Sequence, residues 1–217
     1  MENVTDRTTN PFGMSPPCAE RTPGGHEAVF GYGDANADVH VVGDNPRVHG
    51  GGDSGVPFTG TDGGDRLRSV LADVGLLEEE GGRTTARNCF LSYLHACWPP
   101  AEGPDVDDYA RLEPFFDAEL RAIGAHVLVP IGERAVAHVL REYTSRADRV
   151  GTDPEAVHAT EVHGRGWLVL PAADPATWTD EQASRLRERL ADLLAGDYRQ
   201  ISDLGRFQPH ADPYYVR

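Results

Sequence analysis

The chain has 217 residues, and 35 acidic against 20 basic residues give it a formal net charge of −15. This length suits one well-buried domain, and no stretch approaches the roughly eighteen consecutive apolar residues of a membrane span. The N-terminus has neither the basic nor the apolar region of a signal peptide, so we expect a cytoplasmic protein without membrane contact. We also expect it to be a monomer. All 20 basic residues are arginine.

The acidic excess is typical of a halophilic-type surface that is solvated in concentrated salt. In such a medium the Debye length falls to about 3 Å, so a local arginine-lined groove matters more than net charge. The negative charge therefore does not exclude nucleic acid as a partner.

The two ends of the chain differ in composition from its middle. Residues 1–28 are rich in Thr, Pro and Gly without periodicity, which predicts an extended or partly disordered segment. Residues 29–196 form the predicted domain. Residues 197–217 form a tail in which arginines alternate with aromatic residues; such a tail could line a nucleic-acid surface or pack over the core.

Inside the domain, four short and continuously apolar runs predict strands that are buried on both faces. Amphipathic patterns between them predict helices, the last of which stops at Gly196. The strand runs are 37–43, 88–94, 125–132 and 166–172, and the helical patterns are 65–77, 112–123, 132–143 and 180–195. This alternation predicts an α/β fold: a three-layer α/β/α sandwich with a central four-stranded, mainly parallel sheet.

The loop after the first predicted strand is rich in glycine, with eight in residues 41–64. Asp44 and Asn45 stand at its start, and ligands of open α/β sheets bind at such strand ends. Gly43-Asp44-Asn45-Pro46 is also a good turn by itself, because Asp and Asn bond their own backbone and Pro fixes φ. No P-loop or dinucleotide fingerprint is present, which disfavours a nucleoside-triphosphate site.

Four segments, taken in order, resemble the uracil-DNA glycosylase superfamily, most closely its family 4 and family 5 members. They read VVGDNPRVHGGGDSGVPFTG, HACWPP, VLVPIGERA and LPAADPATW, and the similarity spans about residues 28–195. The family shows G-E-A-P-G or G-L-A-P-A, then G-x-P-F-x-G, K-C-R-P-P, V-I-V-x-L-G-x-x-A and H-P-S or H-P-A. The resemblance implies a hydrolase of base excision repair, an N-glycosylase that flips a damaged or deaminated base out of DNA and removes it with an activated water.

The resemblance also implies roles for the first loop. Asp44 or Asn45 matches the position that activates the water, and Gly43 and Pro46 belong to the same substrate-binding turn. Phe58 matches the aromatic residue on which the base stacks. Without the resemblance, Phe58 would be assigned to the hydrophobic core.

Two positions depart from the family pattern. Tyr93 replaces the Asn that pairs with the base edge, and one phenol hydroxyl cannot reproduce a bidentate amide contact. Asp174, followed by Pro175, replaces the His that stabilises negative charge on the departing base, which an ionised Asp would repel. His163 or His95 could substitute as the donor. Alternatively, a protonated Asp174 acts as general acid towards another base such as a deaminated purine, or it caps a turn or the last helix.

The three cysteines form neither a closed disulfide framework nor a C-x-x-C pair, so we expect them to be reduced. Family 4 members hold an iron–sulfur cluster with four cysteines, and only Cys97 and Cys18 match as possible remnants. We therefore expect no cofactor, with Cys89 as a small buried hydrophobe. No histidine pair has metal-site spacing, so no metal is expected.

Three functions remain open. The first is a DNA N-glycosylase with an altered pocket, which takes DNA as its partner. The second is a catalytically degenerate member that binds nucleic acid or a partner protein, which the loss of both pocket residues favours. The third is a hydrolase of free nucleosides or nucleotides, which would lack an arginine-lined groove beside the pocket.

Overall fold

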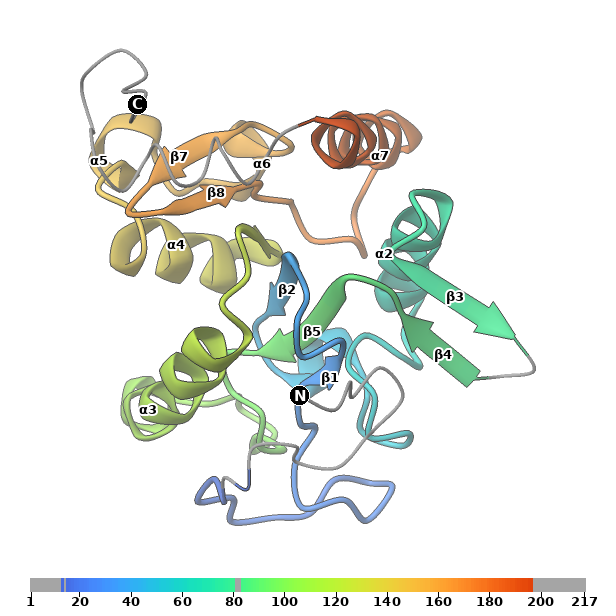
Figure 1. The fold of residues 1–217 in the computed structure, drawn as a ribbon. Coiled ribbons are helices and arrows are strands. Elements are labelled where there is room, and N and C mark those ends of the chain that lie inside the picture. The colour runs from blue at the N-terminus through green and yellow to red at the C-terminus, as the bar shows by residue number, and fades with distance from the viewer. Residues whose placement is uncertain (1–12, 14, 81–82, 197–217) are drawn as a thin grey trace.

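The computed structural model describes residues 13, 15–80 and 83–196 (Figure 1). The strands are β1 (Tyr32–Gly33), β2 (Val39–Gly43), β3 (Leu77–Glu80), β4 (Arg83–Ala86), β5 (Cys89–Tyr93), β6 (Val127–Pro130), β7 (Val162–Gly164) and β8 (Trp167–Val169). The helices are α1 (Pro46–His49), α2 (Asp62–Asp73), α3 (Val106–Ile123), α4 (Gly132–Glu142), α5 (Ala147–Val150), α6 (Pro154–Val157) and α7 (Asp180–Ala195). The predicted tail, 197–217, lies outside the described residues, as do residues 1–12 and 14 of the predicted N-terminal segment. The domain limits 29–196 stay a prediction.

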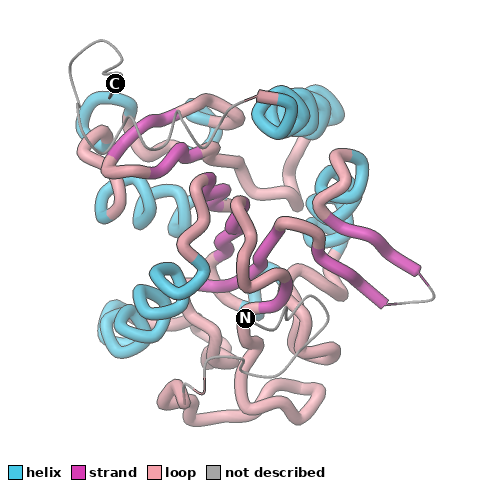
Figure 2. Tube along the Cα trace, viewed as in Figure 1, coloured by secondary structure: helices cyan, strands magenta, loops and turns pink. Residues whose placement is uncertain are grey.

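Six of the strands form one sheet in the order β1-β5-β2-β6-β8-β7. The four central strands, β5, β2, β6 and β8, run parallel, and β1 and β7 add antiparallel edges. The predicted four-stranded parallel sheet is therefore the centre of a wider sheet. β3 and β4 form a separate hairpin, which projects from the body of the molecule (Figure 2).

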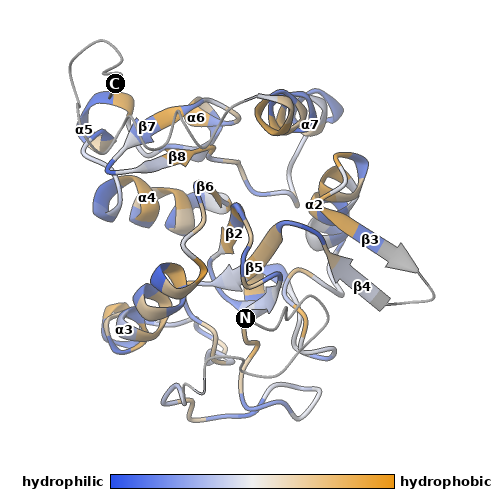
Figure 3. Cartoon of the chain, in the orientation of Figure 1, coloured by the Kyte–Doolittle hydropathy of each residue, from blue (hydrophilic) through white to orange (hydrophobic). Residues whose placement is uncertain are grey.

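Helices cover both faces of the sheet, which confirms the predicted three-layer α/β/α class. One core joins the sheet to α2 and α7, and the other joins it to α3 and α4. Neighbouring residues of β6 show why the strand is apolar throughout: Val127 and Val129 belong to the first core, whereas Leu128 belongs to the second. Apolar residues accordingly predominate in β2, apart from His40, and in β8 (Figure 3). None of the helices in the described ranges is long and apolar enough to cross a membrane.

Local capping explains where the long helices begin and end. Asp105 and Asp108 form a capping box at the start of α3, and Gly124 ends that helix in the left-handed region. Thr179 and Gln182 form the equivalent box for α7. The predicted helix at 65–77 begins earlier, at Asp62, because the Thr61 side chain caps it.

The described part of the N-terminal lead-in, residues 13 and 15–28, lies against the glycine-rich loop after α1 and the loop after β5. Cys18 and Cys97 form a disulfide across 79 residues of sequence. Gly24 N–H donates to Gly52 O at 3.0 Å, and Val29 N–H donates to Ala96 O at 2.9 Å. The expectation of three reduced cysteines is thus wrong for two of them, because these contacts bring the lead-in beside the later loop. Cys89 is free and buried, and burial raises its thiol pKa.

Candidate functional site

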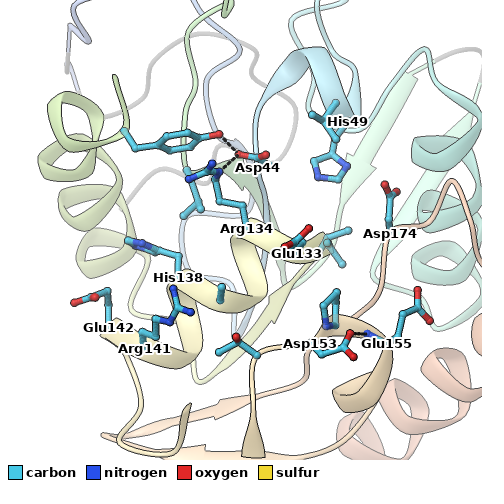
Figure 4. Close-up of a pocket in the computed structure, with 18 residues that line it drawn as sticks. Asp44, His49, Glu133, Arg134, His138, Arg141, Glu142, Asp153, Glu155 and Asp174 are labelled. Atoms are coloured by element: carbon cyan, nitrogen blue, oxygen red, sulfur yellow. Dashed lines mark hydrogen bonds and ion pairs between the residues drawn. The ribbon is translucent and has the colours of Figure 1, made fainter. Parts of the chain in front are cut away.

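A large cavity opens at the carboxyl ends of the parallel strands, with a volume of about 1090 Å³. Three loops bring residues to it. Asp44 follows β2, Gly132 begins α4 directly after β6, and Asp174 follows β8, while His49 ends α1 and also lines the cavity (Figure 4). This is the place where open α/β sheets bind ligands. The structure thus brings the predicted Asp44 and Asp174 to one cavity.

Asp44 is held in place by α3 and α4. The Tyr109 hydroxyl donates a hydrogen bond to Asp44 Oδ1, and Arg134 Nε lies 3.9 Å from the same oxygen. The Arg134 guanidinium in turn lies 4.1 Å from the centre of the Tyr109 ring. Burial and the adjacent Asp44 carboxylate raise the pKa of Tyr109, so this phenol stays protonated as a donor. Both contacts use Oδ1, and the carboxylate orientation is therefore fixed from one side.

His49 is the site residue that sequence reasoning missed. His49 is only 4% exposed, and its Nε2 has no hydrogen-bond partner among the described residues. Burial lowers its pKa, and the carboxylates of Asp174 and Asp44 partly oppose this shift. The available signal was its position within the glycine-rich loop, but the sequence analysis considered histidines only as pairs with metal-site spacing.

Phe58 and Tyr93 form a wall behind His49. The His49 ring centre lies 5.5 Å from that of Phe58 and 6.2 Å from that of Tyr93, nearly parallel to the latter at 20°. Phe58 is 0% exposed, so its ring offers no surface to a base in this conformation. Stacking of a base on Phe58 stays a prediction that requires His49 to move.

The Tyr93 hydroxyl is fully occupied by the glycine-rich loop. It accepts a hydrogen bond from Phe58 N–H at 2.7 Å and donates one to Gly50 O at 3.0 Å. Phe58 has a φ of 60°, a conformation that costs about 1–3 kcal/mol in a non-glycine residue. The bond from its N–H to Tyr93 helps to hold that backbone. Tyr93 therefore supports the loop, and it does not line the cavity.

The remaining residues of the first turn also have structural contacts. Asn45 is buried, and its Oδ1 accepts hydrogen bonds from Arg47 N–H at 3.0 Å and Val48 N–H at 3.2 Å, which caps α1. Pro46 is the first residue of that helix. A Cβ at Gly43 would lie 2.8 Å from Phe58 Cζ and 2.9 Å from His49 Cδ2, so only glycine leaves room for both rings.

Asp174 combines a turn contact with a place in the cavity. Its Oδ1 accepts a hydrogen bond from Ala176 N–H at 3.0 Å, so the turn-capping alternative describes this carboxylate correctly. The last helix is capped by Thr179 instead. Pro175 lies in the same turn, and its carbonyl accepts a hydrogen bond from Arg66 at 3.4 Å.

Neither of the two predicted substitute donors lines the cavity. His95 Nδ1 bonds to Cys97 O at 3.1 Å, and His163 Nε2 lies 3.7 Å from Glu161 on the β7 side. Of the two histidines that line the cavity, His49 and His138, His49 is the one whose pKa is affected by the charge of Asp174.

The cavity lining is acidic. Six carboxylates face it against the two guanidinium groups of Arg134 and Arg141. The carboxylates belong to Asp44, Glu133, Glu142, Asp153, Glu155 and Asp174. Because Arg134 already contacts Asp44, much of this negative charge is uncompensated within the cavity.

The cysteines do not fit a four-cysteine iron–sulfur cluster. Cys18 and Cys97 are bonded to each other, and Cys89 is buried in the first core. In the described part of the chain, no group of three or more His, Cys, Asp or Glu side chains is arranged to hold a metal ion. The predicted absence of a cofactor stays a prediction, and no chemical step below uses one.

The fold and the position of the cavity define an α/β/α protein with its site at the strand ends, and comparison with known proteins gives the family. The family model of the uracil DNA glycosylase superfamily matches residues 30–194. The type-5 uracil-DNA glycosylase of Pyrobaculum aerophilum is 30% identical over 180 residues, covering 80% of this chain and 75% of that protein. The type-5 uracil-DNA glycosylase of Mycobacterium leprae is 28% identical over 120 residues, 52% of each chain. The chain belongs to the uracil DNA glycosylase superfamily, which confirms the resemblance seen in the sequence.

Proposed function

We propose that this protein is a DNA N-glycosylase that hydrolyses the glycosidic bond of a damaged or deaminated base during base excision repair. The observation that carries this proposal is the fixed Asp44 carboxylate, which lies at the end of β2 and faces the same cavity as Asp174. The names of the two related proteins support the reaction class.

Asp44 is the residue that we assign to the attacking water. Tyr109 and Arg134 both contact Oδ1, which leaves Oδ2 to accept a hydrogen bond from a water molecule. The water oxygen bonds to C1′ of the flipped nucleotide, and its proton passes to Asp44. The bond between C1′ and the base nitrogen breaks, and its electron pair leaves with the base. Positive charge that develops on the sugar is stabilised by the nearby carboxylates of Asp44 and Asp174.

The acidic lining bears on how DNA is held. Phosphates would be repelled by the carboxylates of the cavity, so we expect only the flipped nucleotide to enter it, with the duplex outside. At high ionic strength this repulsion is screened over a few ångströms, and binding should tolerate salt unusually well.

The same acidic lining favours a second candidate function, hydrolysis of free nucleosides. A nucleoside carries no phosphate and would enter such a cavity without repulsion. The two candidates share the chemistry at Asp44 and differ in whether the substrate is part of DNA.

Single-turnover cleavage of oligonucleotides in high salt tests the proposal. The substrates contain uracil, hypoxanthine, xanthine or a thymine mismatch, and the proteins are wild type, Asp44→Asn and the control Asp192→Asn, whose side chain is exposed on α7. We expect wild type and Asp192→Asn to produce abasic sites from at least one base. Asp44→Asn should be slower by about 10²–10⁴-fold, since positioned general bases contribute that much.

The other outcomes separate the alternatives. Release of base from free nucleosides, but not from any oligonucleotide, would replace DNA with a nucleoside substrate. No cleavage of either substrate class at enzyme excess, with retained DNA binding, would identify a catalytically degenerate member. Equal rates for wild type and Asp44→Asn would overturn the role of Asp44.

A further inference from the structure

The position of His49 is not explained by the fold. Buried polar groups are normally hydrogen-bonded, yet Nε2 of this buried ring has no partner among the described residues. His138 also lines the cavity with an unpartnered Nε2, but its ring packs on Phe116 and Tyr143, and it lies beside Arg141 and Glu142 (Figure 4). His49 instead lies at the end of the cavity that holds Asp44 and Asp174.

The unpartnered Nε2 of His49 is itself buried, in a ring that forms part of the cavity wall. Phe58 and Tyr93 pack against the ring from the loop and from β5. Towards α4, the next residue is Gly132, and even a Cβ built there would stay 3.8 Å from Nε2 and 3.6 Å from Cε1. In Figure 4 the ring points into the cavity between Asp44 and Asp174. No side chain of Gly132 stands in front of Nε2, so a small shift of the His49 ring would bring this buried nitrogen to a ligand atom in the cavity.

We propose that His49 is a catalytic residue that donates an Nε2–H hydrogen bond to the departing base. The last loop has Asp174 and no histidine at the position where the family pattern has this donor. This inference rests on the proposed glycosylase function. It places the base in the cavity in front of His49, so that neither Phe58 nor Tyr93 touches it.

The chemistry agrees with this assignment. His49 is buried and is therefore in its neutral form near neutral pH, which can carry its proton on Nε2. When the bond from C1′ to the base breaks, the base gains negative charge, and a donor aimed at that charge stabilises it. The base leaves as an anion and then takes the proton that Asp44 received from water. His49 keeps its own proton, and the protons balance over one turnover.

Asp174 cannot do the same when ionised, because a carboxylate has no proton to donate. One of its oxygens is already bonded to Ala176 N–H. Its negative charge instead acts to raise the pKa of His49, which partly opposes the effect of burial and helps the ring to keep a proton. Asp174 thus acts on His49 through its charge.

Two variants of His49 test the inference in the single-turnover assay. His49→Phe keeps an aromatic ring against Phe58 and Tyr93 but removes the donor, whereas His49→Gln keeps an N–H donor at a similar reach. His163→Gln, in β7 and outside the cavity, is the matched control. We expect His49→Phe to lose about 10²–10³-fold in rate, as when a donor to developing charge is removed. His49→Gln should recover part of that loss, and the control should match wild type.

A change of leaving group distinguishes catalysis from structural support. 5-Fluorouracil is a better leaving group than uracil and needs less stabilisation, so His49→Phe should lose less rate on it than on uracil. Asp44→Asn should lose cleavage rate by a similar factor on uracil and on 5-fluorouracil. Equal rates for His49→Phe and wild type, or equal losses on both bases, would overturn the role of His49 while leaving the glycosylase function intact. A wild type that cleaves no substrate would overturn both.

Discussion

Two buried histidines, His40 in β2 and His49 in α1, show what separates a structural polar group from a functional one. Both rings are almost fully buried, and each has one nitrogen without a partner among the described residues, Nδ1 in His40 and Nε2 in His49. Burial lowers both pKa values, to about 3 for His40. The difference lies in what surrounds them: His40 is enclosed by the core, whereas His49 borders a large cavity.

His40 belongs to a buried network of hydrogen bonds. Its Nε2 lies 2.7 Å from Ser92 Oγ, and Ser92 also bonds to the Glu119 carboxyl, which bonds to the backbone of Gly31. Phe90 packs edge-on against the His40 ring at 5.2 Å. The adjacent cavity has a volume of only 30 Å³, room for about one water. A perturbed pKa therefore marks a site here only where a group also has access to a ligand.

The largest stability effect that we predict comes from Glu119→Gln. Burial raises the pKa of Glu119 from 4.5 to about 7. The folded state thus holds an extra proton between these values, and stability falls as pH rises through this window. Gln does not ionise and so avoids this loss. The free energy of unfolding of the variant should exceed that of wild type by on the order of 3 kcal/mol above pH 7 and equal it near pH 4. Urea unfolding at several pH values measures this.

The control for Glu119→Gln is Glu113→Gln, an exposed position on the same helix, which should follow the wild-type pH profile. His40 acts in the opposite direction: its folded pKa is below that of the unfolded chain, so stability falls as pH drops from 6.5 towards 3. If the stability of Glu119→Gln changed with pH above 4.5 in the same way as that of wild type, Glu119 would not titrate with a raised pKa.

Tyr93→Phe separates loop support from base recognition. The variant leaves Phe58 N–H and Gly50 O without their partner, which should lower the free energy of unfolding by about 1–3 kcal/mol. The order of preference among excised bases should not change. Tyr143→Phe, whose hydroxyl lies 3.5 Å from Asp117, serves as a control with a smaller loss. A changed base preference in Tyr93→Phe would instead assign this residue to substrate recognition.

The smallest effect is expected from Asn45→Ala. Loss of an N-cap side chain costs about 1 kcal/mol, and Asn45→Asp should retain the cap because the carboxylate still accepts from the helix N–H groups. Cleavage by Asn45→Ala should fall far less than cleavage by Asp44→Asn. Urea denaturation measures the loss of stability, and the single-turnover assay measures the loss of cleavage rate. If Asn45→Ala lost as much cleavage rate as Asp44→Asn, Asn45 would belong to the catalytic residues.

Much of the fold could be predicted because the central strands and the long helices have strong local patterns. β1 and β7 were missed because two or three residues carry no periodicity, and β3 was missed because Leu77–Glu80 is mostly charged. The Cys18–Cys97 disulfide joins positions 79 residues apart, a pairing that spacing does not indicate.

The candidate site was only partly predictable for a similar reason. Asp44 could be found from its place after a strand, and Asp174 from its place in the last motif of the family resemblance. The environment of His49 depends on Phe58 and on Tyr93, which reaches the same loop from a distant strand. The capture of the Tyr93 hydroxyl by Gly50 and Phe58 is likewise a tertiary contact, so the sequence could show the substitution but not its structural use.

The most direct test of the central claim is an NMR titration of the imidazole ¹⁵N resonances of wild type with uracil and with hypoxanthine, the free bases. We predict that saturation with the base that the protein excises shifts the His49 signals and leaves those of the enclosed His40 unchanged. His49→Phe assigns the signal. The claim that the base is released at His49 would be contradicted if a base bound without shifting the His49 resonances. It would also be contradicted if neither base bound at high concentration.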